Sequence, residues 1–65
     1  MNESNEKILR VVLERLLVAR DGDEEQLAEA LEIVDEATAM LPGPAVRRIY
    51  RLRRAILEHR ATRAA

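Results

Sequence analysis

The triplet Pro42-Gly43-Pro44 is the feature that most restricts the fold of this 65-residue chain. Proline cannot continue a helix, and it disfavours helical geometry for the residue before it, so a helix that reaches Leu41 must end there. Pro44 has the fixed φ angle that suits the first turn of a new helix. The triplet therefore predicts two helices that meet at a hairpin or a sharp corner.

A second break lies at residues 21–23. Gly22 suits the left-handed position that follows many helices. Asp23 is a good helix N-cap, and Gln26 follows it at the spacing of a capping box. With a cap at Asn2 or Ser4 for the first segment, we predict helices over residues 4–20, 24–41 and 44–60. The fold class is all-α: one domain, residues 1–65, folded as a small three-helix bundle or as helical hairpins.

Each predicted helix has an apolar arc of about 180°, wider than the stripe of about 100° that one packing partner covers. Val11 and Val18 fall outside the arc of the first helix, and they are either tolerated surface valines or part of a second contact seam. Nineteen Val, Ile, Leu and Met residues follow Met1, an aliphatic excess that favours a homodimer over a monomeric bundle. The predicted self-association residues are Val11, Leu17, Val18, Ile33, Met40 and Arg53.

Charge is divided unevenly along the chain. Residues 1–43 carry eleven acids and four bases, whereas residues 44–65 carry seven arginines and one acid. In one interpretation the last two helices lie side by side and their opposite charges line a shared rim, where exposed pairs contribute only about 0–1 kcal/mol each. In the other, the arginines face outward and bind a partner. The predicted partner-binding residues are Arg47, Arg48, Tyr50, Arg51 and Arg54.

That partner is either an acidic protein surface or the phosphates of a nucleic acid. Base readout in DNA uses Asn, Gln, Ser or Thr beside arginine, and the basic segment offers only Thr62, near its end. RNA recognition relies on aromatic stacking, and Tyr50 is the only aromatic residue. A protein partner is therefore the leading hypothesis, and a nucleic acid is the alternative.

Arg53 and Arg60 lie on the apolar side of the last predicted helix. Either their stems rest on the core with the guanidinium in water, or they meet carboxylates of another subunit. His59 is the only histidine, and no carboxylate is placed beside it at a spacing that would build a metal site. We expect it to be a surface histidine near a helix C-terminus, and we expect no metal site.

No residue pattern indicates an enzyme. Ser4, the only serine, is a candidate helix cap, and the chain has neither a cysteine nor a glycine-rich phosphate loop. We expect no catalytic residue, no cofactor and no small-molecule substrate. No apolar run reaches the roughly 18–20 residues of a membrane span, and the start of the chain lacks the features of a secretion signal, so a cytoplasmic protein without membrane association is expected.

Together these patterns predict a non-enzymatic regulatory or adaptor module that acts through protein–protein interaction, as a homodimer. The first two helices are expected to supply most of the core and the dimer seam. The third is expected to present its arginines and aliphatic side chains to the partner. The alternative function is a small nucleic-acid-binding regulator that uses the basic third helix.

Overall fold

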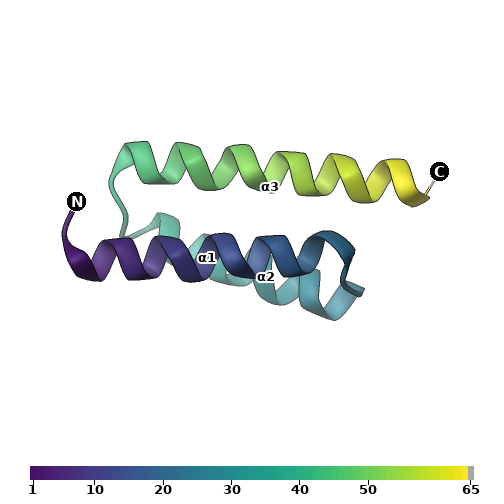
Figure 1. Ribbon diagram of the computed structural model, residues 1–65, viewed down its shortest axis with the longest axis horizontal. Helices are drawn as coiled ribbons and strands as arrows, with labels where there is room; N and C mark the ends of the chain where they lie inside the picture. The colour runs from purple at the N-terminus through teal and green to yellow at the C-terminus, as the bar shows by residue number, and fades with distance from the viewer. Residues whose placement is uncertain (65) are drawn as a thin grey trace.

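The computed structural model describes residues 1–64 and consists of three α-helices joined by short turns. Helix α1 spans Glu3–Asp21, α2 spans Glu24–Thr38 and α3 spans Gly43–Ala64. Helices α1 and α3 run in the same direction and α2 runs in the opposite one (Figure 1). The predicted all-α bundle is confirmed over this part of the chain, and its principal extents are 40 × 19 × 15 Å.

Both helix starts in the first half of the chain are capped by side chains. The Asn2 Oδ1 atom accepts a hydrogen bond of 2.8 Å from the Asn5 amide, which settles the choice between Asn2 and Ser4. At α2 the Asp23 carboxylate accepts from the Gln26 amide, and the Gln26 side chain accepts from the Asp23 amide, both at 2.9 Å. The predicted capping box is therefore confirmed.

The left-handed conformation predicted for Gly22 is wrong. Its φ of −85° and ψ of −178° describe extended backbone, which any residue can adopt. Space explains the glycine better, since a Cβ atom here would clash with Gln26 Oε1 and lie 3.0 Å from the Val18 carbonyl oxygen. Because Gln26 Oε1 is already engaged by the Asp23 amide, a side chain at position 22 would disturb the capping box.

The second break is placed correctly, but the helices on either side of it differ in length from the prediction. Helix α2 ends at Thr38, three residues earlier than expected, because the Met40 and Leu41 amides both turn back to the Ala37 carbonyl oxygen. Helix α3 continues to Ala64, four residues further than expected. In this last turn the Thr62 hydroxyl donates to the Glu58 carbonyl oxygen at 3.0 Å.

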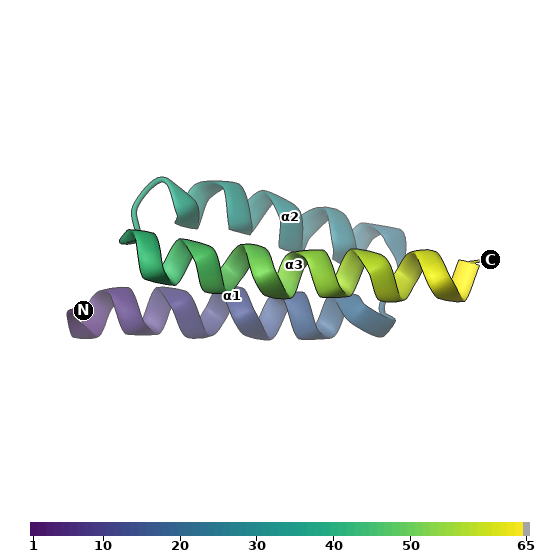
Figure 2. The ribbon, with the colours of Figure 1, turned by 90° about the horizontal axis from the view of Figure 1, so that it is seen from above.

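Helix α1 is the element that the other two share. Both α2 and α3 pack closely along α1, whereas α2 and α3 approach each other only slightly. Seen from above, α3 lies along the α1/α2 pair, and its C-terminal end extends beyond the turn that joins them (Figure 2). The proline break therefore does not pack the second and third helices closely along each other, as the side-by-side interpretation of their charges required. The break turns the chain so that both helices reach α1.

The core is entirely aliphatic, as the composition indicated. Side chains from all three helices meet in one cluster. Its largest fully buried members are Val12, Leu16, Val34, Ile49 and Ile56. Full burial of such a side chain stabilises a fold by about 1.5–3 kcal/mol. Alanines occupy the other tight positions, which lets the helices approach closely. No described helix is both long enough and apolar enough to cross a membrane.

Candidate protein-binding surfaces

Six large apolar side chains in the described part of the chain remain more than 45% exposed, and four of them lie on helix α1 or just after α2. These four are Val11, Leu17, Val18 and Met40. All the other Val, Ile and Leu side chains are at least half-buried. The fold therefore hides most of the aliphatic excess that the sequence showed, and the remainder is concentrated on two surfaces of α1.

The first surface, here called the α1/α2 patch, consists of Ile8, Val11, Val18, Ile33 and Met40. Four of these residues surround a shallow hollow of about 260 Å³ to which α3 contributes no residue. Val11 and Met40 are 48% and 62% exposed. Val18 lies seven residues after Val11, which places it on the same face of α1. Around the hollow the patch spans both helices, and Val18 extends it along α1.

Charges of opposite sign flank the two sides of this patch. Lys7, Arg15 and the single acid Glu14 lie on α1, while Glu29 and Glu36 lie on α2. Arg15 and Glu29 approach to 4.0 Å, with both side chains 55% exposed. An ion pair this long and this exposed contributes little to stability. These groups therefore remain available to a molecule that covers the patch.

The second surface, here called the α1/α3 groove, runs between these two helices. One stretch of it has a volume of about 490 Å³ and is lined by Leu13, Leu17, Arg48, Arg51, Leu52 and Ala55. Leucines and an alanine form its floor, and the two arginines lie at its edge. A neighbouring hollow of about 400 Å³ shares Leu13 and Arg48 and adds Glu6 and Arg10, so the groove continues toward the start of α1.

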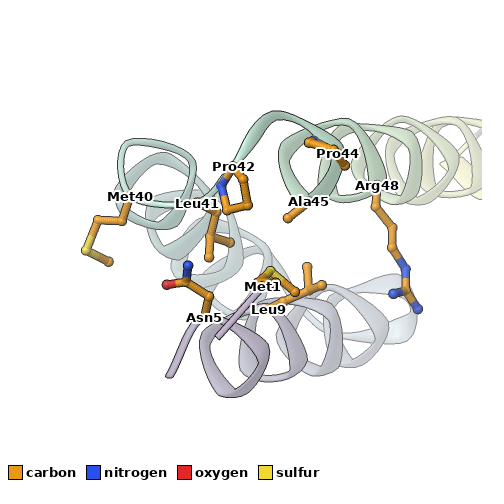
Figure 3. A pocket seen from close by; sticks show the side chains of 9 residues that line it. All are labelled: Met1, Asn5, Leu9, Met40, Leu41, Pro42, Pro44, Ala45 and Arg48. Atoms are coloured by element: carbon orange, nitrogen blue, oxygen red, sulfur yellow. The ribbon is translucent and has the colours of Figure 1, made fainter. Parts of the chain in front are cut away.

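The groove opens at its end into the largest hollow of the described structure, about 800 Å³, between the starts of α1 and α3 and the turn before α3. Leu9, Leu41 and Ala45 point into it, and Arg48 reaches from α3 toward α1 at its side (Figure 3). Arg48 lines all three hollows. It is therefore the charged residue with the widest access to this side of the molecule.

The predicted basic face is exposed, but the structure divides it into two parts. Arg48 and Arg51 line the α1/α3 groove, whereas Arg47 and Arg54 line none of the described hollows. Arg54 forms a 3.2 Å ion pair with Glu58 one turn further along α3. Within residues 1–64 no ion pair joins Arg47, Arg48 or Arg51 to a carboxylate. Tyr50 is 46% exposed on the same helix.

The predicted self-association residues do not form one surface. Val11, Val18, Ile33 and Met40 belong to the α1/α2 patch, but Leu17 lies in the α1/α3 groove. Arg53 is half-buried on α3 and makes no ion pair or hydrogen bond with another side chain in the described structure. The apolar arc of α1 is wide because it serves two neighbours, so exposed positions at its opposite edges face different directions.

Arg60 has a role that the sequence reasoning missed. Its guanidinium donates to the carbonyl oxygens of Ala19 and Gly22, at 2.8 and 2.7 Å, and to the Glu24 carboxylate at 3.2 Å. Its side chain is 16% exposed. Neither the solvent-directed nor the intersubunit interpretation applies to it, because it binds the turn between α1 and α2 within its own chain. A signal was present in its register with Ile49 and Ile56, which places it on the buried side of α3.

The same turn collects other charges from the end of α3. Asp21 Oδ1 lies 3.4 Å from His59 Nε2 and 3.2 Å from Arg63 Nη1. Among α2 acids, only Glu24 pairs with α3, through Arg60. The predicted rim of opposite charges is therefore confined to one end of the bundle. Over residues 1–64 no group of three His, Asp or Glu side chains is placed to hold a metal ion.

Comparison with known proteins adds no assignment, because no family model, curated protein or solved structure matches this chain.

Proposed function

We propose that this chain is a non-enzymatic regulatory or adaptor module that binds another protein and assembles as a homodimer through the α1/α2 patch. The observation that carries the proposal is the exposure of Val11 and Met40 around one apolar hollow, with Val18 exposed on the same face of α1. Exposed aliphatic side chains that cluster on a small protein mark interaction surfaces more often than chance positions do.

The size of the chain supports self-association through this patch. A domain of about 60 residues buries only about 60% of its unfolded surface and is marginally stable alone. A second copy that covered the patch would add the burial of two sets of aliphatic side chains, at about 25 cal/mol for each Å² of apolar surface. A closed two-fold pair is the commonest arrangement in which a surface covers its own copy.

The mass of the particle in solution tests the dimer. Light scattering at micromolar concentration should give twice the chain mass of 7.4 kDa. The double variant V11E/M40E should return the mass to that of one chain, because a carboxylate cannot be buried unpaired in an apolar interface. The control is L17E, which places one carboxylate at a similarly exposed leucine outside the patch. The single variants V11E and M40E match it in charge. A wild-type mass of one chain would refute the dimer.

Nucleic-acid binding stays as the second candidate because Arg47, Arg48 and Arg51 are exposed without an intrachain carboxylate partner. The exposed acids of α2 and the single aromatic residue count against it. The logarithm of the affinity for DNA falls linearly with the logarithm of the salt concentration, with a slope of about −0.9 for each neutralised phosphate. A gel-shift experiment with duplex DNA at low salt tests it, and R47E/R51E should abolish any binding.

A further inference from the structure

We infer that the α1/α3 groove binds an amphipathic helix of another protein whose apolar face is flanked by acidic residues. This inference rests on the proposed protein-binding function and names the site and the chemistry of the partner. It does not depend on the dimer, because the groove and the α1/α2 patch share no residue along their lengths. Met40 alone touches both the patch and the hollow at the end of the groove.

The dimensions of the groove fit a short helical segment. Its floor extends along α1 from Leu9 to Leu17 and along α3 from Arg48 to Ala55. At 1.5 Å per residue these stretches are about 12 and 10 Å long, or about two turns of a bound helix. Two turns present apolar side chains at positions i, i+3 or i+4, and i+7 to a groove. The floor is aliphatic, so leucine, isoleucine or methionine would fill it.

The edge of the groove determines the charge of its occupant. Arg10, Arg48 and Arg51 line it, against the single carboxylate of Glu6. Neither Arg48 nor Arg51 forms an ion pair in the described structure. The Arg48 side chain extends from α3 toward α1 across the open end, where an arriving carboxylate can meet its planar guanidinium (Figure 3). Two hydrogen bonds between arginine and a carboxylate give directional as well as electrostatic selectivity.

The occupant is not a second copy of this chain or a nucleic acid. Helix α2 is the acidic element, but the exposed apolar residues on it and just after it are Ala28, Ala39 and Met40. The alanines are too small to fill a floor of leucines, and Met40 belongs to the α1/α2 patch. A contact between α2 of one copy and the groove of the next would also be head-to-tail and would generate open chains. Bases need aromatic platforms for stacking, and the floor has none.

Binding of synthetic peptides tests the groove directly. The probes are helix-stabilised peptides of about 14 residues with leucines at the i, i+3 and i+7 positions and either glutamate or lysine beside them. Fluorescence anisotropy should show the glutamate peptide binding the full chain at least about tenfold more tightly than the lysine peptide. In R48E/R51E this preference should reverse. In the control R47E/R54E, which has the same change in net charge outside the groove, it should persist.

Three results would overturn the inference: no binding of the glutamate peptide, equal loss of binding in both double variants, or a preference that R48E/R51E does not reverse. Equal loss of peptide binding in both double variants would indicate attraction to the overall positive charge of α3. The same charge would attract duplex DNA. Light scattering on the same samples separates this result from the dimer. Loss of peptide binding with an intact dimer refutes the groove alone, and a monomer that keeps its glutamate preference refutes the dimer alone.

Discussion

At the scale of single residues, Arg60 supplies the cap that the end of α1 lacks. Gly22 is extended, so the left-handed glycine motif does not satisfy the last carbonyl groups of α1, and the Arg60 guanidinium hydrogen-bonds two carbonyls of this turn instead. Arg60 lies 41 positions after Ala19 and 38 positions after Gly22, so these are long-range contacts in the sequence. One side chain thus fixes the end of α3 against the turn between the other two helices.

Replacement of Arg60 by alanine should therefore destabilise the fold far more than replacement of an arginine on the solvent side. Hydrogen bonds from a charged group contribute about 1.5–3 kcal/mol, so we expect R60A to lower the free energy of unfolding by about 2 kcal/mol. The control is R54A, which removes an exposed pair one turn apart on α3, worth about 0.3–0.5 kcal/mol. Urea unfolding measures both, and equal losses would contradict the cap.

The two glycines should respond differently to alanine. At Gly22 the new Cβ would displace Gln26 Oε1 and break the capping box, at a cost of about 1 kcal/mol. At Gly43 the nearest atom to a new Cβ is Arg47 Nη1 at 3.5 Å, an ordinary contact, and φ is not positive. There the lower entropy of the unfolded chain favours alanine, but a Cβ on the helical residue before Pro44 opposes it, so G43A should be nearly neutral. Thermal melts of G22A and G43A compare them, and a stabilising G22A would show that the turn relaxes freely.

At the scale of helices, the shared position of α1 has a direct consequence for fragments. Because α2 and α3 scarcely touch, residues 23–65 should be mostly unfolded as an isolated peptide, and isolated helices of this length are marginal in water. Residues 1–41 keep the α1/α2 contact and should retain more helix per residue. Circular dichroism of both peptides tests this, and adding residues 1–22 to the first should restore helix. A fully helical 23–65 fragment would contradict the shared role of α1.

The features that the sequence predicted are those set by neighbouring residues. Asp23 and Gln26 form their capping box within one turn. Pro42 excludes a helix that continues past Leu41, so local spacing was sufficient to place both breaks. The arrangement of the helices depends on distant residues. A wide apolar arc on α1 indicates more than one neighbour, but periodicity does not show which helix covers which edge.

The candidate surfaces also divide into features that neighbouring residues determine and features that depend on distant residues. The outward arginines and the position of Val11 and Val18 outside the main arc follow from helical geometry alone, and the structure exposes all of them. The assignment of Leu17 to the groove required the position of α3, as did the separation of Arg48 from Arg47. The partners of Arg60 are backbone carbonyls, which have no sequence signature.

At the scale of the whole molecule, the charges beside the α1/α2 patch select one of two symmetric dimers. Two bases, Lys7 and Arg15, and one acid, Glu14, flank the patch on α1, and only acids flank it on α2. A two-fold axis across the helices would place α1 on α1 and bring like charges together. An axis parallel to the helices would place α1 over α2 of the partner subunit and bring opposite charges together. Complementary charges suppress wrong arrangements more than they add affinity, so we expect the second dimer.

A charge exchange tests this arrangement, because Lys7 and Glu36 line the same hollow at one level of the bundle. In the expected dimer each Lys7 faces Glu36 of the partner subunit. The single variants K7E and E36K should each dimerise more weakly than the wild type, since both self-pairings bring like charges together. A mixture of the two should form a heterodimer at least about tenfold tighter than either homodimer, because both contacts become attractive.

Lys7 and Glu36 also flank the same seam within one chain, so each substitution could change the stability of its own chain. The mixture controls for this. Any intrachain repulsion in K7E or E36K remains when the variants are mixed, so recovery of the dimer reports only contacts between subunits. Sedimentation of the separate and mixed proteins at matched concentration and low salt measures it, and 1 M salt should reduce the difference by screening. If the wild type is a dimer but mixing K7E with E36K does not restore dimerisation, the interface has the other two-fold arrangement.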